Sequence, residues 1–329
     1  MQSLVLTRDG LQVADTPITP LMPGDVRIEV RSVGISGTDL AIWKGDLDAP
    51  LPIILGREIA GVIHESSVPE FAPGAMVTTE VDLACGRCWY CKKTLKHLCL
   101  TKQTLGFTVD GGMREYLSVP ADLIHLLPDG VDMLAGTFVE PLASAIQTQI
   151  DSPVERGESV LVIGSGKLGL LISQIYDATG ADVLLLDRNR YQLGIGRQLG
   201  LTHTINTEET DWKKAVLEAT SGAGPALVVE ATGTPDGFTM ALEIVRSRGA
   251  IALKSMHGHD VQINATEIVN REIRVVGTSR GPYSKALDML SKGRIEVNRL
   301  VSKQFTLEDG SKAFEHANQP DVTKVLVNI

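Results

Sequence analysis

The chain has 329 residues, 43% of them hydrophobic and 22% charged, a composition typical of globular proteins with length for about two domains. Its 31 basic residues are outnumbered by 40 acidic ones, and the net charge of −9 leaves no broad basic face to neutralise a nucleic-acid backbone. These values exclude nucleic acid as a predicted partner and leave a small-molecule substrate as the expectation.

Three features of the sequence indicate where in the cell the protein is expected. Residues 1–20 are interrupted by charged residues and prolines and lack the basic start and unbroken apolar stretch of a secretory signal. The longest apolar region, 159–175, contains three glycines and a lysine and is too short to span a bilayer. All four cysteines lie within 85–99, so none remains for a distributed disulfide framework. We therefore expect a cytoplasmic protein with no membrane association.

The first part of the chain is predicted to be mostly β. In residues 25–33 valine and isoleucine alternate with charged residues, the pattern of a half-buried strand. Similar short strands are predicted at 59–64 and 75–81, separated by proline and glycine clusters.

The four cysteines follow these strands with the spacing Cys85-x2-Cys88-x2-Cys91-x7-Cys99. Four thiolates complete a tetrahedral shell around zinc at about 2.3 Å, and a closed shell leaves no position for substrate. The alternative is an iron–sulfur cluster, but the bacterial ferredoxin spacing ends C-x3-C-P and this one does not. We predict one structural Zn²⁺ in a lobe covering about 82–102.

After Pro153 the pattern changes to compact apolar runs separated by helical stretches, which predicts βαβ units and a parallel sheet. Gly180 and Gly200 lie just past two of the helical stretches, where C-terminal caps are expected. The predicted strands are 159–163, 182–186, 226–231, 250–253 and 274–276.

The first of these strands leads into Gly164-Ser165-Gly166-Lys167-Leu168-Gly169 and then into an apolar helix, 170–178, so a G-x-G-x-x-G motif lies in its required context. Gly164 permits the tight turn, Gly166 lets a pyrophosphate approach the backbone, and Gly169 lets helix and strand pack closely. Lys167 and Leu168 open the helix, whose N–H groups and dipole favour phosphate. The motif predicts a dinucleotide site.

Asp187 ends the second predicted strand about 20 residues on, where this motif places an acid. Its carboxylate can accept hydrogen bonds from both adenosine ribose hydroxyls and would repel a 2′-phosphate, which favours NAD over NADP. The neighbouring Arg188 works against that preference, because an arginine there could stack on adenine, pair with a 2′-phosphate or remain a solvated loop charge.

With these features the sequence resembles the medium-chain dehydrogenase/reductase superfamily, in its zinc-dependent alcohol, threonine and polyol dehydrogenase branch. The resemblance implies an α/β fold in which a GroES-like, β-rich catalytic domain, 1–152 and 282–329, encloses a Rossmann domain with a doubly wound parallel sheet, 153–281. The motifs that carry it span nearly the whole chain: Gly37-Thr38-Asp39, Leu55-Gly56-Arg57-Glu58, Ala60-Gly61, the cysteine lobe, Asp110-Gly111-Gly112, Glu115-Tyr116, Glu140-Pro141-Leu142, the Gly164 motif and Glu230-Ala231-Thr232-Gly233.

Two more residues are candidates for binding the cofactor. Thr232 belongs to the last of the resemblance motifs, which follows the predicted strand 226–231. Arg280, just past the strand 274–276, could reach a cofactor phosphate or an anionic substrate, or form a salt bridge at the domain border.

The chain departs from the family at the catalytic metal. Zinc-dependent members have a cysteine where this chain has Ser36 and a histidine where it has Arg57. Glu140 matches the third ligand of the polyol and threonine branch, and Glu58 matches the acid after the ligating histidine. Thr38 retains the hydroxyl that contacts the substrate oxygen in relatives.

A guanidinium has no lone pair and stays protonated, so Arg57 cannot bind zinc. We expect Arg57 instead to stabilise negative charge on the substrate oxygen, with Glu58 and Glu140 orienting it and with Thr38 and Ser36 as hydroxyl proton partners. The alternative is that Arg57 only forms a salt bridge and the pocket has lost its chemistry.

The predicted function is reversible hydride transfer between NAD(H) and an alcohol/carbonyl pair, without a catalytic zinc. Two alternatives stay open: a metal-free reductase of an activated C=C bond, and a non-catalytic sensor of the NADH/NAD ratio. We also expect a homo-oligomer, either a dimer or a tetramer.

Overall fold

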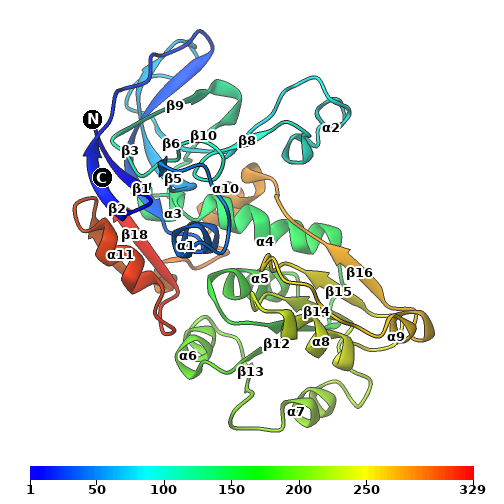
Figure 1. Cartoon of the computed structure of the whole chain (residues 1–329). Coiled ribbons are helices and arrows are strands. Elements are labelled where there is room, and N and C mark those ends of the chain that lie inside the picture. The colour runs from blue at the N-terminus through cyan, green and yellow to red at the C-terminus, as the bar shows by residue number, and fades with distance from the viewer. The chain divides into compact units, whose positions relative to one another are not determined.

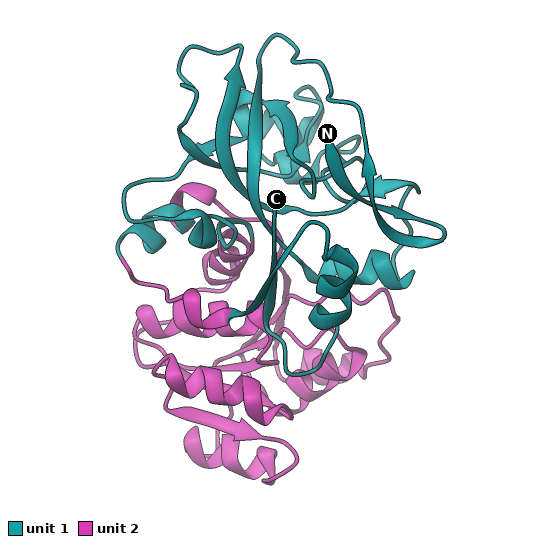
Figure 2. Ribbon diagram, turned by 90° about the vertical axis from the view of Figure 1, so that its left-hand side faces the viewer, with its two compact units in different colours: residues 1–140, 286–292, 301–329 teal, residues 141–285, 293–300 magenta.

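The computed structural model describes residues 1–329 and divides the chain into two compact units, shown in two colours in Figure 2. Unit 1 comprises Met1–Glu140, Ala286–Lys292 and Val301–Ile329, and unit 2 comprises Pro141–Lys285 and Gly293–Leu300. None of the helices combines the length and the apolar character that crossing a lipid bilayer requires.

The division into units differs from the domain boundary predicted after residue 152. Unit 2 already begins at Pro141, because helix α4 (Val139–Asp151) packs against helix α5 (Lys167–Ala178). The buried hydroxyl of Tyr176 on α5 lies 3.1 Å from the carbonyl oxygen of Thr148 and 2.9 Å from that of Ser152. The apolar face of α4 therefore belongs to the Rossmann unit.

The second boundary was predicted at 281/282, but the chain passes between the two units more than once in this region. Residues 293–300 return to unit 2, where the side chain of Gln174 makes two hydrogen bonds to the backbone of Glu296, at 3.1 Å and 2.8 Å. No sequence pattern predicts this return, because at Glu296 the bonds are made by backbone groups that every residue carries.

Unit 2 is built on a six-stranded, all-parallel sheet with the order β13-β12-β11-β14-β15-β16, the doubly wound arrangement that the alternating pattern predicts. The five predicted strands are confirmed, and the short, polar β13 is an addition. The strands are β11 (Ser159–Ile163), β12 (Asp182–Asp187), β13 (His203–Asn206), β14 (Leu227–Glu230), β15 (Ala250–Leu253) and β16 (Arg274–Gly277). The remaining helices are α6 (Arg190–Gln198), α7 (Trp212–Ala219), α8 (Pro235–Ile244) and α9 (Ala265–Asn270).

The central strands of this sheet are buried on both faces. Leu161 and Ile163 of β11 lie in an apolar cluster with Val216 of α7 and Leu242 of α8. Val162, which points to the opposite face, is fully buried as well. A parallel strand covered on both faces needs a continuous apolar run, which is the pattern in the sequence.

Unit 1 combines both ends of the chain, as predicted for the GroES-like domain. Its largest sheet has seven strands, with β10-β6-β5-β3-β18-β17 in order and β9 also paired with β3, and smaller sheets join β2-β1-β4 and β7-β8. Strand β18, at the C-terminus, pairs antiparallel with β3 and parallel with β17 (Figure 1).

The strands of unit 1 are β1 (Gln2–Thr7), β2 (Gly10–Asp15), β3 (Asp25–Gly34), β4 (Ile53–Ile54), β5 (Glu58–Ser66), β6 (Met76–Thr79), β7 (Asp82–Leu83), β8 (Gln103–Thr104), β9 (Tyr116–Pro120), β10 (Ile124–Leu126), β17 (Val301–Thr306) and β18 (Lys324–Asn328). Its helices are α1 (Gly37–Lys44), α2 (Trp89–Lys92), α3 (Met133–Gly136) and α11 (Gly310–Ala317), and α10 (Tyr283–Ser291) crosses the division.

Prediction for the glycine motif. Gly169→Ala should lower the free energy of unfolding by roughly 1–3 kcal/mol, the range for overpacking a tight contact. A Cβ added there would lie 1.9 Å from the carbonyl oxygen of Gly164. Gly166→Ala is the matched control, since its Cβ would meet nothing within 4 Å. Urea denaturation checks both, and equal stability of the two variants would contradict the packing role of Gly169.

Candidate active site and cofactor site

Arg57 lies in a tight connection between β4 and β5 in unit 1. The preceding Gly56 has φ +97°, and a Cβ there would lie 2.7 Å from Val33 Cγ1 and 2.8 Å from Met113 Cγ, so the turn requires glycine. The guanidinium that follows is almost completely buried, with 3% of Arg57 exposed. The turn therefore carries a permanent positive charge into the interior of unit 1.

Glu140 is the carboxylate that ion-pairs with this charge. Its Oε1 lies 3.9 Å from Arg57 Nε, and both side chains are buried. That separation allows Coulomb attraction but is too long for a hydrogen bond. The Nε and Nη2 atoms of Arg57 consequently have no hydrogen-bond partner in the chain.

Ser36 caps helix α1. Its hydroxyl donates to Asp39 Oδ2 at 2.6 Å and accepts from the Asp39 N–H at 3.2 Å, while Asp39 Oδ2 also accepts from the Ser36 N–H at 2.8 Å. This is a capping box, and the sequence analysis, which assigned Ser36 a proton role, missed it. The hydroxyl of Thr38, in the first turn of α1 and half-buried, makes no hydrogen bond within the chain.

Asp39 is the third acid near Arg57. Its Oδ1 accepts from the Gly56 N–H at 2.9 Å, so the carboxyl group links the start of α1 to the turn before Arg57. Complete burial raises the pKa of Asp39 above its usual value, although the hydrogen bonds from Ser36 and Gly56 and the charge of Arg57 act in the opposite direction.

Glu58 forms a buried ion pair that sequence reasoning missed. Its Oε2 accepts from Lys324 Nζ at 2.7 Å, and Lys324 also donates to the carbonyl oxygen of Thr137 at 2.7 Å. The ammonium lies 3.9 Å from the ring centroid of Phe138. Gly34 leaves room for the pair, because a Cβ there would lie 2.5 Å from both Glu58 Oε2 and Lys324 Nζ.

This arrangement changes the role expected for Glu58. The sequence assigned it to orient Arg57, and the structure provides Lys324 as its ion-pair partner. The available signal was a single lysine at the start of the apolar segment Lys324–Asn328, since a lysine is rarely fully buried unless paired.

The donor set around Arg57 does not fit a divalent cation. Ser36 and Arg57 occupy the positions where the family has a cysteine and a histidine, and the guanidinium both lacks a lone pair and repels a cation. Among groups of three or more histidine, cysteine, aspartate or glutamate side chains, the cysteine lobe is the one whose ligand atoms come together.

The four cysteine Sγ atoms all lie within 4.8 Å of one another, with Cys85 to Cys91 at 3.9 Å and Cys88 to Cys91 at 3.5 Å. Tetrahedral zinc with Zn–S bonds of about 2.3 Å requires Sγ atoms about 3.8 Å apart, so these residues and Cys99 fit the metal. Strands β7 and β8 close the base of the lobe, where Thr104 donates to Asp82 at 2.7 Å.

Ionisation of these thiols is uneven. Hydrogen bonds from the backbone of Arg87 and Cys88 lower the pKa of Cys85 to about 6. Desolvation raises the pKa of Cys91 to about 12, and its neighbouring thiols act in the same direction. A divalent cation would favour the thiolate form of all four groups, because it compensates the negative charges that otherwise repel one another.

In unit 2 the glycine motif forms the predicted turn. Gly164 has φ +102°, and a Cβ there would lie 2.6 Å from the carbonyl oxygen of Ala231. Gly166 is the N-cap of α5 and has open space where its Cβ would be, so its backbone can be approached closely. Lys167 and Leu168 form the first turn of α5 and are partly exposed. The geometry suits a pyrophosphate at this helix N-terminus.

Asp187, at the end of β12, is directly connected to this turn. Its Oδ2 accepts from the N–H and the hydroxyl of Ser165, at 2.5 Å and 2.8 Å, and its Oδ1 accepts from the Asn189 N–H at 2.9 Å. Asp187 was predicted at this position, whereas its partner Ser165 was not predicted. The neighbouring Arg188 is exposed, and its carbonyl oxygen accepts from Asn206 at 3.1 Å.

The other predicted cofactor residues follow strands of the same sheet. Thr232 lies after β14 and donates its hydroxyl to the buried carboxylate of Glu230 at 2.6 Å, an acceptor that Ser255 shares at 2.9 Å. Arg280 lies after β16 and is half-buried. Because carboxyl ends of parallel strands meet at one edge of a sheet, the structure gathers Gly164, Asp187, Thr232 and Arg280 along that edge.

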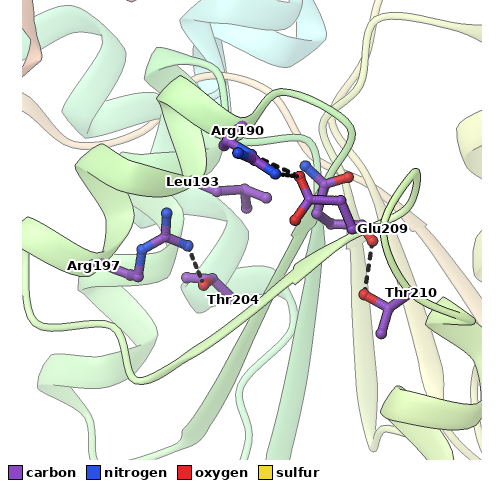
Figure 3. A pocket seen from close by; sticks show the side chains of 7 residues that line it. Arg190, Leu193, Arg197, Thr204, Glu209 and Thr210 are labelled. Atoms are coloured by element: carbon purple, nitrogen blue, oxygen red, sulfur yellow. Dashed lines mark hydrogen bonds and ion pairs between the residues drawn. The ribbon is translucent and has the colours of Figure 1, made fainter.

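A separate cavity of about 340 Å³ lies between α6 and β13 (Figure 3). Its two arginines are already engaged, Arg190 with Glu209 at 2.7 Å and Arg197 with Thr204 at 2.8 Å. Asn206, which also lines it, holds the Arg188 carbonyl oxygen. Both arginines that line this cavity therefore have partners among its other lining residues.

The fold and these sites define a dinucleotide-dependent oxidoreductase. The family model for the alcohol dehydrogenase GroES-like domain matches residues 22–129, and that for zinc-binding dehydrogenases matches residues 168–292. The chain is 30% identical to sorbitol dehydrogenase of Halalkalibacterium halodurans, with 99% of each protein covered. The chain belongs to the medium-chain dehydrogenase/reductase superfamily, and it is an alcohol dehydrogenase-like enzyme that uses a nicotinamide dinucleotide.

Solved structures share the whole fold. A protein from Sinorhizobium meliloti, assigned as a zinc-binding dehydrogenase and solved with NADP, has a TM-score of 0.94 at 28% identity, covering 100% of this chain and 99% of that one. An alcohol dehydrogenase of Escherichia coli complexed with NADH has a TM-score of 0.93 at 25% identity, with the same coverage. Similar structures therefore hold either dinucleotide.

Prediction for the buried pair. Lys324→Met should destabilise the protein by about 3–5 kcal/mol, because it leaves the Glu58 carboxylate buried without its cation. The double variant Lys324→Met with Glu58→Gln should recover much of this loss, since no uncompensated charge remains. Chemical denaturation measures both. A single variant as stable as the wild type would contradict the pairing.

Proposed function

We propose that this enzyme oxidises an alcohol to a carbonyl compound, and catalyses the reverse reaction, without a catalytic metal. The observation that carries this proposal is the Arg57 guanidinium, which is buried and has two hydrogen-bond donors unused within the chain. A preorganised cation in a low-dielectric site stabilises negative charge that develops on a substrate oxygen. Arg57 thus supplies the electrostatic part of what a Lewis acid supplies in zinc enzymes.

The reaction balances with residues of this chain and the dinucleotide. A bound nicotinamide dinucleotide would supply the acceptor for the hydride of the carbon that carries the hydroxyl. The hydroxyl proton leaves through Thr38, whose half-buried side chain has no other partner in the chain and can pass it to solvent. Ser36 holds the start of α1 in place, so we assign proton transfer to Thr38 alone.

The two acids Glu140 and Glu58 contribute to the site through the positions of their carboxylates. Glu140 faces Arg57 at 3.9 Å and limits where the guanidinium can move, while leaving the Nε and Nη2 donors available. Glu58 is held by Lys324, so it supports the walls of the site without neutralising Arg57 directly. The likeness to sorbitol dehydrogenase supports an alcohol that carries further oxygen atoms near the reacting carbon.

NAD is the proposed cofactor. Asp187 already uses its carboxylate oxygens to accept hydrogen bonds, and a ribose hydroxyl can replace the Ser165 hydroxyl as donor without changing that role. A 2′-phosphate at the same position would face the carboxylate charge. The cysteine lobe is proposed to hold one zinc with a structural role, because four protein ligands leave no open position.

Prediction for the metal. The purified protein should carry about one zinc per chain, bound by the four cysteines. Cys88→Ser should release it and lower stability, since metal binding and folding of such a lobe are coupled. Elemental analysis and thermal denaturation check this. A reproducible content near two would contradict the absence of a second metal site.

Prediction for the cofactor. NADH should bind more tightly than NADPH, and Asp187→Ala should narrow the difference chiefly by weakening NADH, because the ribose loses its acceptor. Fluorescence titration of both dinucleotides measures this. If the wild type prefers NADPH, Arg188 governs the adenosine end and the assignment of Asp187 is wrong.

Prediction for the reacting centre. Arg57→Met should slow hydride transfer by about 10²–10³, equivalent to about 2.7–4 kcal/mol, the effect of removing one preorganised charge stabiliser. NADH affinity should be nearly unchanged. Stopped-flow measurement of NADH formation separates these effects. Full activity of Arg57→Met would refute the assigned role. A second variant, Arg57→His, restores one metal ligand of the family and tests whether activity then requires a metal.

A further inference from the structure

The unbonded donors of Arg57 lie on one edge of its guanidinium. Nε–H and one N–H of Nη2 point in nearly the same direction, which is the fork that grips two oxygens of a planar group side by side. Both nitrogens are buried and lack a partner in the chain, and 3% of the residue is exposed. A buried donor without an acceptor is costly, so this edge is built to receive a ligand.

The acids around Arg57 do not fill the fork. Asp39 accepts from the Ser36 N–H and hydroxyl and from the Gly56 N–H. Glu58 is bound to Lys324 at 2.7 Å. Glu140 is the remaining neighbour, and its 3.9 Å separation from Nε is beyond hydrogen-bond range. The positive charge therefore has one counter-charge, Glu140, which leaves both donors without a hydrogen bond.

We infer that the substrate is a 2-hydroxy acid, with the 2-oxo acid as product, and that the Arg57 fork binds it. This inference rests on the proposed function, which requires Arg57 to reach the reacting oxygen. If one donor contacts that oxygen, the other reaches only an oxygen on the adjacent atom. A carboxylate at that position supplies the second acceptor, and its negative charge strengthens the hydrogen bonds that the two donors make.

The reaction remains balanced for this substrate class. The hydrogen on the hydroxyl-bearing carbon leaves as hydride to the nicotinamide, the hydroxyl proton leaves through Thr38, and the C–O bond becomes C=O. The carboxylate is unchanged by the reaction and anchors the substrate to Arg57. Negative charge rises on the oxygen at the centre of the reaction, between the carbon and one Arg57 donor, where the cation acts most strongly.

Other oxygen-rich ligands fit less well. A neutral vicinal diol offers two acceptors but no charge to compensate the guanidinium. A phosphate dianion calls for a second cation, and the buried Lys324 is already held by Glu58 and the Thr137 carbonyl oxygen. A single carboxylate matches the single fork.

The test uses oxamate, a non-reducible analogue of a 2-oxo acid, titrated into the full-length enzyme saturated with NADH. Wild type should bind oxamate, and Arg57→Met should weaken it by about 10- to 100-fold, the effect of losing charge-assisted hydrogen bonds. Arg57→Lys, which keeps the charge but loses the fork, should fall between them. Arg31→Met is the control for loss of one positive charge, because Arg31 is exposed on unit 1 and pairs with Glu29.

A turnover panel of glycolate, lactate, glycolamide and neutral diols accompanies the binding assay. Preference for the acids over the uncharged amide supports the inference. Oxamate that fails to bind the wild type, or binds Arg57→Met equally well, overturns it. Tighter binding of glycerol 3-phosphate at Arg57 overturns the carboxylate assignment in favour of phosphate. If neutral alcohols are oxidised and oxamate does not bind, this inference is overturned but the proposed function stands. If no alcohol is oxidised, the proposed function itself is wrong.

Discussion

The burial of one permanent cation, Arg57, is the constraint on which the site depends. Bringing a guanidinium into the interior is unfavourable unless nearby charges and hydrogen bonds compensate it. Here the compensation is partial, with Glu140 at 3.9 Å and two donors left unbonded. The surrounding acids are kept from completing it, because Ser36, Gly56 and Lys324 occupy them. A buried cation whose charge is only partly compensated is unfavourable without a ligand. The same cation can strongly stabilise an oxyanion that develops beside it.

The same surroundings show how backbone geometry fixes the charge. Gly56 makes the turn that places Arg57, and the Gly56 N–H is held by Asp39, which also belongs to the capping box of α1. Gly34 provides the space in which Glu58 and Lys324 meet. Lys324 comes from the C-terminal strand, so both ends of the chain are needed to build the site. A rigid scaffold of this kind suits electrostatic stabilisation, which loses effect if the charge can move away.

Sequence reasoning found the features that depend on local patterns. The glycine motif, Asp187 and the cysteine spacing are short-range signals, and the apolar runs of the parallel sheet follow from burial on both faces. The Glu58–Lys324 pair joins residues 266 apart, and its one signal is the lysine at the start of an apolar strand. The return of 293–300 to unit 2 has no such signal. The capping role of Ser36 is a local pattern, with Asp39 three residues on, whereas the bond from the Ser165 hydroxyl to Asp187 joins residues 22 apart and depends on the fold.

The most direct test of the account is the rate of hydride transfer in a single turnover, measured while zinc is added to protein that starts with only its four-cysteine site filled. We expect a rate that stays constant as zinc content rises from about one toward about two per chain, because Arg57 supplies the positive charge. We also expect that brief chelation leaves the rate unchanged. A rate that rises in proportion to a second zinc, and falls when a chelator removes it, would contradict the central claim.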